Sequence, residues 1–278
     1  APRATEYLYD WQDRQISTKS GVETTLPSGF SDSNIGSPAM TGSGTFDGSS
    51  FQVSGGGAGL IANSTAVTSD QFNFLSESLS GDTTLISRVA SLTSVNNNDG
   101  SQAGLMIRAN SSIGSMFAAV EVTPHGGVEF LWRTSDNSSA MSSITLSVAA
   151  PVWLELQRSG NSFTASYSTD DSTWHQIGST GTISMGSSEM AGLTVSADDN
   201  SGLGMARFDN VSVGGTAIVA SESDHLHRPL TVQTLDNAGE VLITAQYDGD
   251  GIPFVDANGD GIPDALTSSA LRAYSAMD

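Results

Sequence analysis

An aspartate-rich segment near the end of the chain carries the side chains best suited to chemistry. Within residues 247–264 the sequence Gly-Asp-Gly-Ile-Pro occurs twice, ten residues apart. Around the second copy, oxygen-bearing residues stand at positions 1, 3, 5 and 9 of an Asp-x-Asn-x-Asp-Gly loop, namely Asp256, Asn258, Asp260 and Asp264. A tight turn with this spacing directs hard oxygen ligands onto one Ca²⁺, and Gly261 permits the chain reversal. We therefore expect a calcium site, with Ca²⁺ as the cofactor.

Further ligands can be named beside this loop. The carbonyl of Ile262 would supply another oxygen, and Asp248 and Asp250 are candidates for a neighbouring half-site. Position 12 of the loop is Thr267, where an EF-hand has a bidentate glutamate, so the segment is more similar to thrombospondin type 3 or dockerin-like repeats. The alternative interpretation is a solvated acidic turn built from good turn formers. A calcium site of this kind is expected to be structural.

A second set of side chains is suited to contact with a sugar. Indole rings offer flat apolar faces, and arginine and glutamate side chains offer hydrogen bonds to hydroxyl groups. The candidates lie on or next to expected strands: Arg108, Glu121, Trp132, Arg133, Trp153 and Trp174. The alternative is that the tryptophans pack between sheets and that the arginines pair with acidic residues. The sequence leaves both interpretations open.

The elements that must position these residues are short β-strands. From about residue 31 to residue 215, apolar and polar residues alternate in short runs between clusters of Gly, Asn and Asp, without a sustained 3.6-residue period. The strands expected at 152–157 and 163–168 are separated by Gly160 and Asn161, which both tolerate positive φ and so predict a hairpin. Further strands are expected at 103–108, 116–123, 128–134 and 206–213. This pattern predicts an all-β sandwich or barrel.

Several segments of this region resemble a bacterial extracellular module. They are residues 35–38, 51–57, 70–74, 81–82, 87–89, 103–108, 153–158 and 208–211, which follow the order seen in that module. The module is similar to a concanavalin A-like (laminin G-like, jelly-roll) fold, and the resemblance covers about two-thirds of the chain. It implies a two-sheet antiparallel β-sandwich. It is less specific for function, because lectins, carbohydrate-binding modules, glycosidases and structural domains share this superfamily.

Two flanking regions complete the expected domain organisation. Residues 1–30 form an N-terminal arm with Tyr7, Tyr9 and Trp11, residues 31–215 form the sandwich, and residues 216–278 form a small extension with strands and calcium-binding loops. An extended arm can add a strand to the exposed sheet edge of a neighbour. Copies of the same chain are therefore candidate partners.

Composition limits the remaining partners. The formal charge of the 278-residue chain is −20, which argues against nucleic acid and anionic lipid. The absence of cysteine excludes disulfides and thiolate metal sites. The chain starts at Ala1 without a basic leader and has no apolar run of 18 residues, so we expect a secreted, signal-cleaved product without a membrane span.

Hydrolysis of glycosidic bonds is the function that the sequence favours least. Retaining glucanases of the resembled fold carry Glu-x-Asp-x-x-Glu or Glu-x-Asp-x-Glu on one strand, and neither pattern occurs here. Glu121 and Glu129 lie on successive expected strands, where we expect them to partner arginines. The sequence favours a non-catalytic extracellular protein that binds a polysaccharide or surface glycan. The alternative is a self-assembling structural subunit of a filament, surface layer or matrix.

Overall fold

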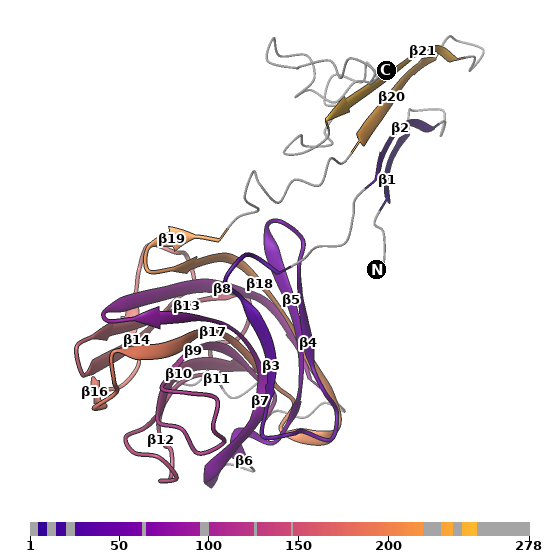
Figure 1. Ribbon diagram of the computed structural model, residues 1–278. Helices are drawn as coiled ribbons and strands as arrows, with labels where there is room; N and C mark the ends of the chain where they lie inside the picture. The colour runs from indigo at the N-terminus through magenta and orange to yellow at the C-terminus, as the bar shows by residue number, and fades with distance from the viewer. Residues whose placement is uncertain are drawn as a thin grey trace. The chain divides into compact units, whose positions relative to one another are not determined.

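The computed structural model describes residues 5–9, 15–20, 26–62, 65–94, 100–124, 127–145, 147–218, 229–235 and 241–248. All regular elements in these ranges are β-strands (Figure 1). Within the same ranges no helix is present that could cross a membrane. The chain divides into two units, one of residues 25–219 and one of residues 1–24 with 220–278.

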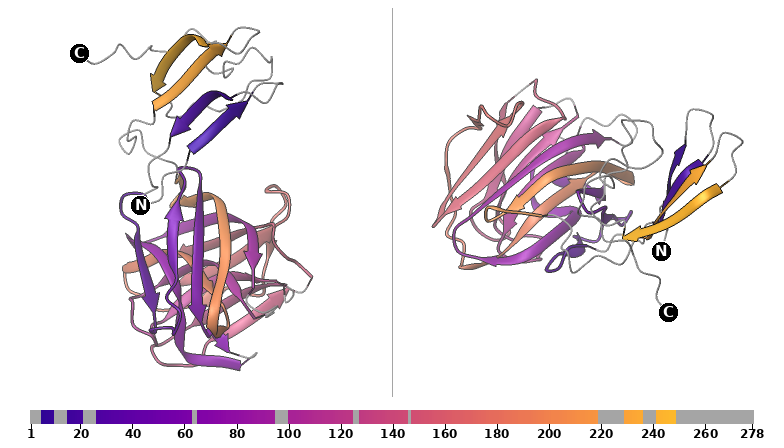
Figure 2. Two further views of the ribbon diagram at one scale, coloured as in Figure 1. Left: turned by 90° about the vertical axis from the view of Figure 1, so that its right-hand side faces the viewer. Right: turned by 90° about the horizontal axis from the view of Figure 1, so that it is seen from above.

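The larger unit consists of two antiparallel sheets, which the views of Figure 2 show packed face to face. The eight-stranded sheet has the order β12 (Met141–Thr145), β11 (Gly127–Arg133), β10 (Phe117–Thr123), β9 (Gln102–Arg108), β17 (Ser188–Ser196), β7 (Thr65–Ser80) and β3 (Ser31–Ile35), with β6 (Gly59–Ala62) paired to β7. The nine-stranded sheet has the order β15 (His175–Gln176), β14 (Ser162–Ser168), β13 (Val152–Ser159), β8 (Thr83–Thr93), β18 (Asp199–Val213), β5 (Ser50–Gly57) and β4 (Ser43–Phe46). In addition, β16 (Gly181–Thr182) pairs with β14, and β19 (Thr216–Ala217) pairs with β18. The predicted two-sheet antiparallel sandwich is confirmed.

The predicted hairpin joins β13 and β14. Ser159 pairs with Ser162, and Gly160 in the turn has a φ of 58°, in the left-handed region that glycine adopts without steric cost. The strand expected at 206–213 is longer than predicted, because β18 begins at Asp199. Its pairing with β5 shifts register between Asp199 and Gly204, and such irregular pairing does not follow from an alternation pattern.

The core between the sheets is formed by the inward residues of both sheets. One register row across the eight-stranded sheet contains Phe130, Val120, Leu105, Leu193 and Leu75, all at most 1% exposed. Burial of each such side chain stabilises the folded state by roughly 1.5–3 kcal/mol relative to leaving it exposed to water.

The eight-stranded sheet is also buried on its outer face. Every residue of β9 and β10 is buried, and side chains alternate between the two faces of a strand. The outer set forms a second apolar cluster, which includes Ile35, Leu60, Phe72, Phe74, Met106, Phe117, Ala119 and Leu131. In β8 and β13, by contrast, every second residue reaches solvent. The nine-stranded sheet therefore presents a solvated outer face, which we call the open face.

The smaller unit contains strands from both ends of the chain. The order is β1 (Thr5–Tyr9), β2 (Gln15–Ser20), β20 (Pro229–Leu235) and β21 (Val241–Asp248), and all neighbours are antiparallel. Ser17 of β2 pairs with Val232 of β20. The N-terminal arm of the sequence analysis thus pairs with the C-terminal extension of its own chain.

Candidate functional site

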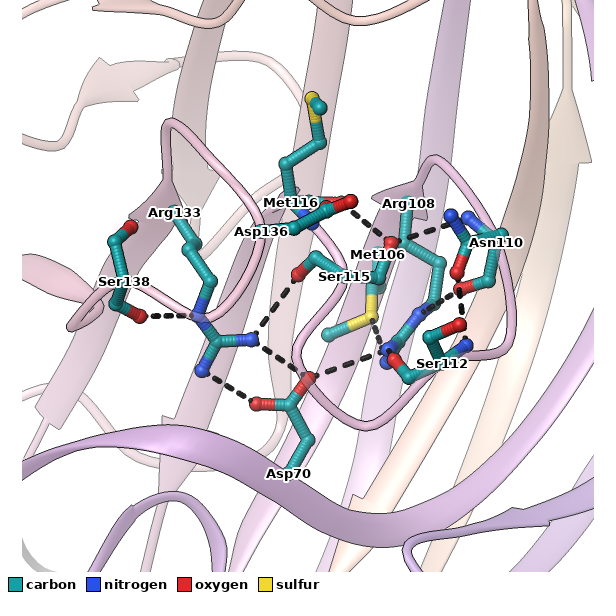
Figure 3. A network of polar contacts seen from close by, with 10 residues as sticks. All are labelled: Asp70, Met106, Arg108, Asn110, Ser112, Ser115, Met116, Arg133, Asp136 and Ser138. Atoms are coloured by element: carbon teal, nitrogen blue, oxygen red, sulfur yellow. Dashed lines mark hydrogen bonds and ion pairs between the residues drawn. The ribbon is translucent and has the colours of Figure 1, made fainter.

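Asp70, Arg108 and Arg133 form a buried ion-pair network over the eight-stranded sheet (Figure 3). Asp70 Oδ1 lies 2.7 Å from Arg133 Nη2, Asp70 Oδ2 lies 3.3 Å from Arg108 Nη2, and all three side chains are 0% exposed. Other guanidinium N–H groups donate to backbone carbonyls in residues 110–115 and at Ser138. Burial lowers the pKa of Arg108 to about 10, so this side chain stays charged at neutral pH. These donors, predicted as sugar ligands, make their contacts inside the protein.

Glu121 is a closed-off carboxyl group on the same outer face. Glu121 is 2% exposed. Its Oε1 atom accepts a hydrogen bond from Thr194 Oγ1 at 2.7 Å, whereas its buried Oε2 atom has no hydrogen-bond partner. Glu129 lies opposite Glu121 in the register of β10 and β11. Burial raises the pKa of Glu121 to about 8, the Thr194 hydrogen bond opposes this shift, and the charge of Glu129 adds to it. Glu121 is therefore predominantly a neutral acid at pH 7.

The three candidate tryptophans lie in separate places. Trp132 of β11 stacks on Phe130, with ring centroids 4.8 Å apart, beside β16 of the other sheet. Trp174 is half-buried in the loop between β14 and β15, where Asp170 accepts hydrogen bonds from two backbone N–H groups of the same turn. Trp153 is half-buried on the open face. The structure brings Arg108, Arg133 and Glu121 to one sheet face and places Trp153 on the other sheet.

The centre of the open face carries an accessible ion pair. Trp153 of β13 is opposite Arg88 of β8, and Arg88 is opposite Asp209 of β18. Arg88 Nη1 lies 3.1 Å from Asp209 Oδ2, and the two side chains are 36% and 22% exposed. Because both side chains reach solvent, they can offer donors and acceptors to a ligand beside an indole ring.

A depression of about 400 Å³ lies further along β8 and β18 on the open face. Its lining includes Thr45, Gln52, Ser54, Ser91, Met205 and Arg207, from strands β4, β5, β8 and β18. The Arg207 side chain is 51% exposed, lies 4.0 Å from Asp47 Oδ2 and donates from Nε to Ser50 Oγ at 3.1 Å. Met205 is 57% exposed. The depression thus combines hydroxyl groups, an amide, a guanidinium group and an apolar surface.

Sequence reasoning did not single out Gln52, Arg88, Met205 or Arg207. A usable signal was present, because apolar and polar residues alternate at 51–54 and 206–209, which places the polar residues on one solvated face. The missing information was strand order. Arg207 and Ser50 are in contact although 157 residues separate them.

The predicted calcium ligands lie largely outside the described residues. These are Asp250, Asp256, Asn258, Asp260, Ile262 and Asp264, and Asp248 is described as the end of β21 without its side chain. Within the described part of the chain, no group of three His, Cys, Asp or Glu side chains could hold a metal ion. The calcium site stays a prediction.

Comparison with known proteins identifies the sandwich. Residues 87–212, from β8 to β18 and just under half of the chain, match the family model of the β-xylosidase C-terminal concanavalin A-like domain. The sandwich has the concanavalin A-like fold. In this concanavalin A-like sandwich the matched segment includes the β13–β14 hairpin, Trp153, Arg88 and Asp209. A comparison with curated proteins gives no match.

Solved structures with a similar fold come from several organisms. A functionally unknown protein from Saccharomyces cerevisiae is 15% identical, with a TM-score of 0.49 over 70% of this chain and 100% of that chain. The carbohydrate binding module CBM66 from Bacillus subtilis is 21% identical, with a TM-score of 0.42 over 69% and 97%. A lectin from Bauhinia forficata in complex with GalNAc is 7% identical, with a TM-score of 0.42 over 77% and 100%.

Proposed function

We propose that the concanavalin A-like sandwich is a non-catalytic carbohydrate-binding module and that its ligand lies on the open face. The observation that carries this proposal is that several solvent-accessible side chains able to contact a sugar lie on this one face. They are Gln52, Arg88, Trp153, Met205, Arg207 and Asp209. The family match supports it, because the matched family model is the C-terminal concanavalin A-like domain of β-xylosidase.

The chemistry of these side chains suits the hydroxyl groups of a sugar. Each hydroxyl both donates and accepts, and the Arg88–Asp209 pair offers N–H groups and carboxylate oxygens side by side. The Gln52 amide provides both functions in one group. Trp153 and Met205 supply apolar surface for the C–H face of a sugar ring.

The charge of the protein favours a neutral glycan. A net charge of −20 repels polyanions, and on the open face Arg88 and Arg207 each lie beside an aspartate. The binding surface therefore carries no net positive charge to attract a uronate or sulfate group. We infer a neutral polysaccharide, for which xylan is the first probe.

The absence of catalysis is part of the proposal. Glycoside hydrolysis needs two carboxyl groups that flank the scissile bond. Glu121 and Glu129 are neighbours in register, but Glu121 Oε2 is buried and the apolar cluster occupies that face. We therefore expect the intact chain to release no reducing sugar from a bound polysaccharide.

Affinity electrophoresis tests this proposal. The full chain should be retarded in native gels that contain a neutral polysaccharide, with xylan, mixed-linkage β-glucan, levan and galactomannan tried in parallel. R207A and M205A should lose retardation, whereas M141A removes a comparably exposed methionine on β12 of the other sheet and should keep it. Free migration in all four gels, or retardation unchanged by the open-face variants, would contradict the proposal.

Self-assembly outside the cell is a second candidate function. The favouring observation is that β1 and β21 are the edge strands of the small sheet, and no other described strand pairs with their outer edges. Edge strands of this kind can pair with another chain. We infer that a chain lacking residues 1–20 would fail to polymerise under conditions in which the intact protein does. Electron microscopy of both proteins decides this, and monomers in both samples would remove assembly from consideration.

A further inference from the structure

A second depression lies at the opposite end of the strands that form the open face. It measures about 380 Å³, and its lining includes Asp82, Thr84, Gln157 and Gly215. Asp82 Oδ1 accepts the backbone N–H of Gly160 at 2.6 Å, which ties the β7–β8 turn to the β13–β14 turn. A Cβ built at Gly160 or Gly215 would meet no heavy atom within 4 Å, so the space beside these two turn residues is open.

The register places both depressions on the same sheet face. Thr84 of β8 pairs with Gln157 of β13, and four residues along each strand Arg88 pairs with Trp153. Residues four apart in a strand share a face. Further along β8, the pairing with β18 shifts register between Val89 and Ser91, so that Ser91 and Thr93 lie opposite Arg207 and Met205 on the open face. There Ser91 and Thr93 line the first depression. One face of β8 therefore connects the second depression, the Trp153–Arg88 centre and the first depression.

The length of this connection exceeds a single sugar. Thr84 and Thr93 are nine residues apart in β8, and a rise of about 3.3 Å per residue separates them by roughly 30 Å. The face stays accessible along this length, since Gln157, Ser91 and Arg207 are exposed and Trp153 is half-buried. A monosaccharide could occupy one depression, whereas a chain of several sugars could reach both.

We propose, on the basis of the proposed function above, that the open face binds an internal stretch of a neutral polysaccharide chain that runs along the strands and contacts both depressions. The chain enters and leaves at open ends, so a free chain terminus is not required. We call this path along the open face, from the second depression to the first, the track. Trp153 lies midway along the track and supplies a flat surface for a central sugar ring. Gln157 and Gln52 provide hydrogen bonds at the two ends of the track.

Affinity should therefore depend on oligosaccharide length. Each end of the track adds contacts that become intramolecular once the centre is occupied. Isothermal titration calorimetry with the full chain, using oligosaccharides of one to about eight units from the polysaccharide retained in the gel, measures this dependence. The dissociation constant should fall with each added unit until both depressions are filled and then level off.

Variants at the two ends sharpen the test. Q52A and Q157A should each weaken binding of the longest oligosaccharide about tenfold, the size expected for one or two lost hydrogen bonds. The shortest binding oligosaccharide can use either end, so each single variant should change its affinity by less than twofold. M141A serves as the control, and unchanged melting curves would show that the variants fold.

The possible failures are distinguishable. Equal affinity for the monosaccharide and the polymer, or loss of all binding in one end variant with no effect of the other, would overturn the track while carbohydrate binding stands. Absence of binding to every neutral polysaccharide would overturn the proposed function itself.

Discussion

Replacement of Glu121 by glutamine should remove a pH-dependent part of the protein's stability. Burial raises the pKa of Glu121 from 4.5 to about 8, whereas the unfolded chain exposes this carboxyl group to water. Between these two pH values the folded state holds a proton that the unfolded state releases. The stabilising contribution is therefore complete below about pH 4.5 and is lost as the pH rises through about 8.

The expected magnitude follows from proton linkage. One proton changes the free energy of unfolding by about 1.4 kcal/mol per pH unit. Between pH 5 and pH 7 the loss attributable to Glu121 is about 2–3 kcal/mol, a large share of the roughly 5–15 kcal/mol of a typical domain. In E121Q this loss is absent, because glutamine is neutral at every pH and keeps a carbonyl oxygen for the Thr194 hydroxyl.

Urea unfolding at pH 5, 6, 7 and 8, followed by tryptophan fluorescence, measures this effect. The stability of E121Q relative to the unsubstituted protein should rise by about 2–3 kcal/mol from pH 5 to pH 7. E155Q provides a control. Burial also raises the pKa of Glu155, but this residue is only half-buried on the open face, so a smaller pH-dependent effect is expected. Parallel stability curves for E121Q and the unsubstituted protein would refute the reasoning.

Two further predictions concern the ion-pair network and calcium. D70N should destabilise the sandwich by about 3–5 kcal/mol, because two buried guanidinium groups lose their counter-charge. D209N breaks a solvent-accessible ion pair and should lower the free energy of unfolding by at most about 1 kcal/mol. Similar losses for the two variants in chemical denaturation would contradict the stabilising role of the buried network. Calcium should raise the melting temperature once its free concentration exceeds the dissociation constant, and D260A should abolish this rise. Identical melting curves with calcium and with chelator would show that the aspartate-rich segment is a turn without a bound ion.

The fold could be predicted from the sequence because its determinants are local. Alternation at 152–157 and 163–168 around Gly160 predicts a half-buried hairpin, and the structure contains it as β13 and β14. The unbroken apolar run at 103–107 also carried information that alternation does not, since such runs indicate strands buried on both faces. The structure agrees, because the side chains of the second apolar cluster fill the outer face of the eight-stranded sheet.

Neither the buried ion-pair network nor the candidate site could be predicted in the same way, because their contacts join residues that are remote in sequence. Asp70 and Arg133 are 63 residues apart, and their ion pair depends on how β7 and β11 are placed within one sheet. The same limit applies to Arg207 and Ser50. Residue type alone made Arg108 and Arg133 look like sugar ligands, and strand order decides that Arg88 and Arg207 are the accessible arginines of the described sandwich.

Nuclear magnetic resonance titration tests most directly whether a glycan binds the open face. The ¹⁵N-labelled full chain is titrated with an oligosaccharide of the polysaccharide retained in the gel. The account predicts shifts of the Trp153 indole N–H and the Gln52 side-chain amide, with the Trp132 indole N–H unchanged in its stack on Phe130. Shifts confined to Trp132, or to Thr194 beside Glu121, with Trp153 and Gln52 unaffected, would contradict it.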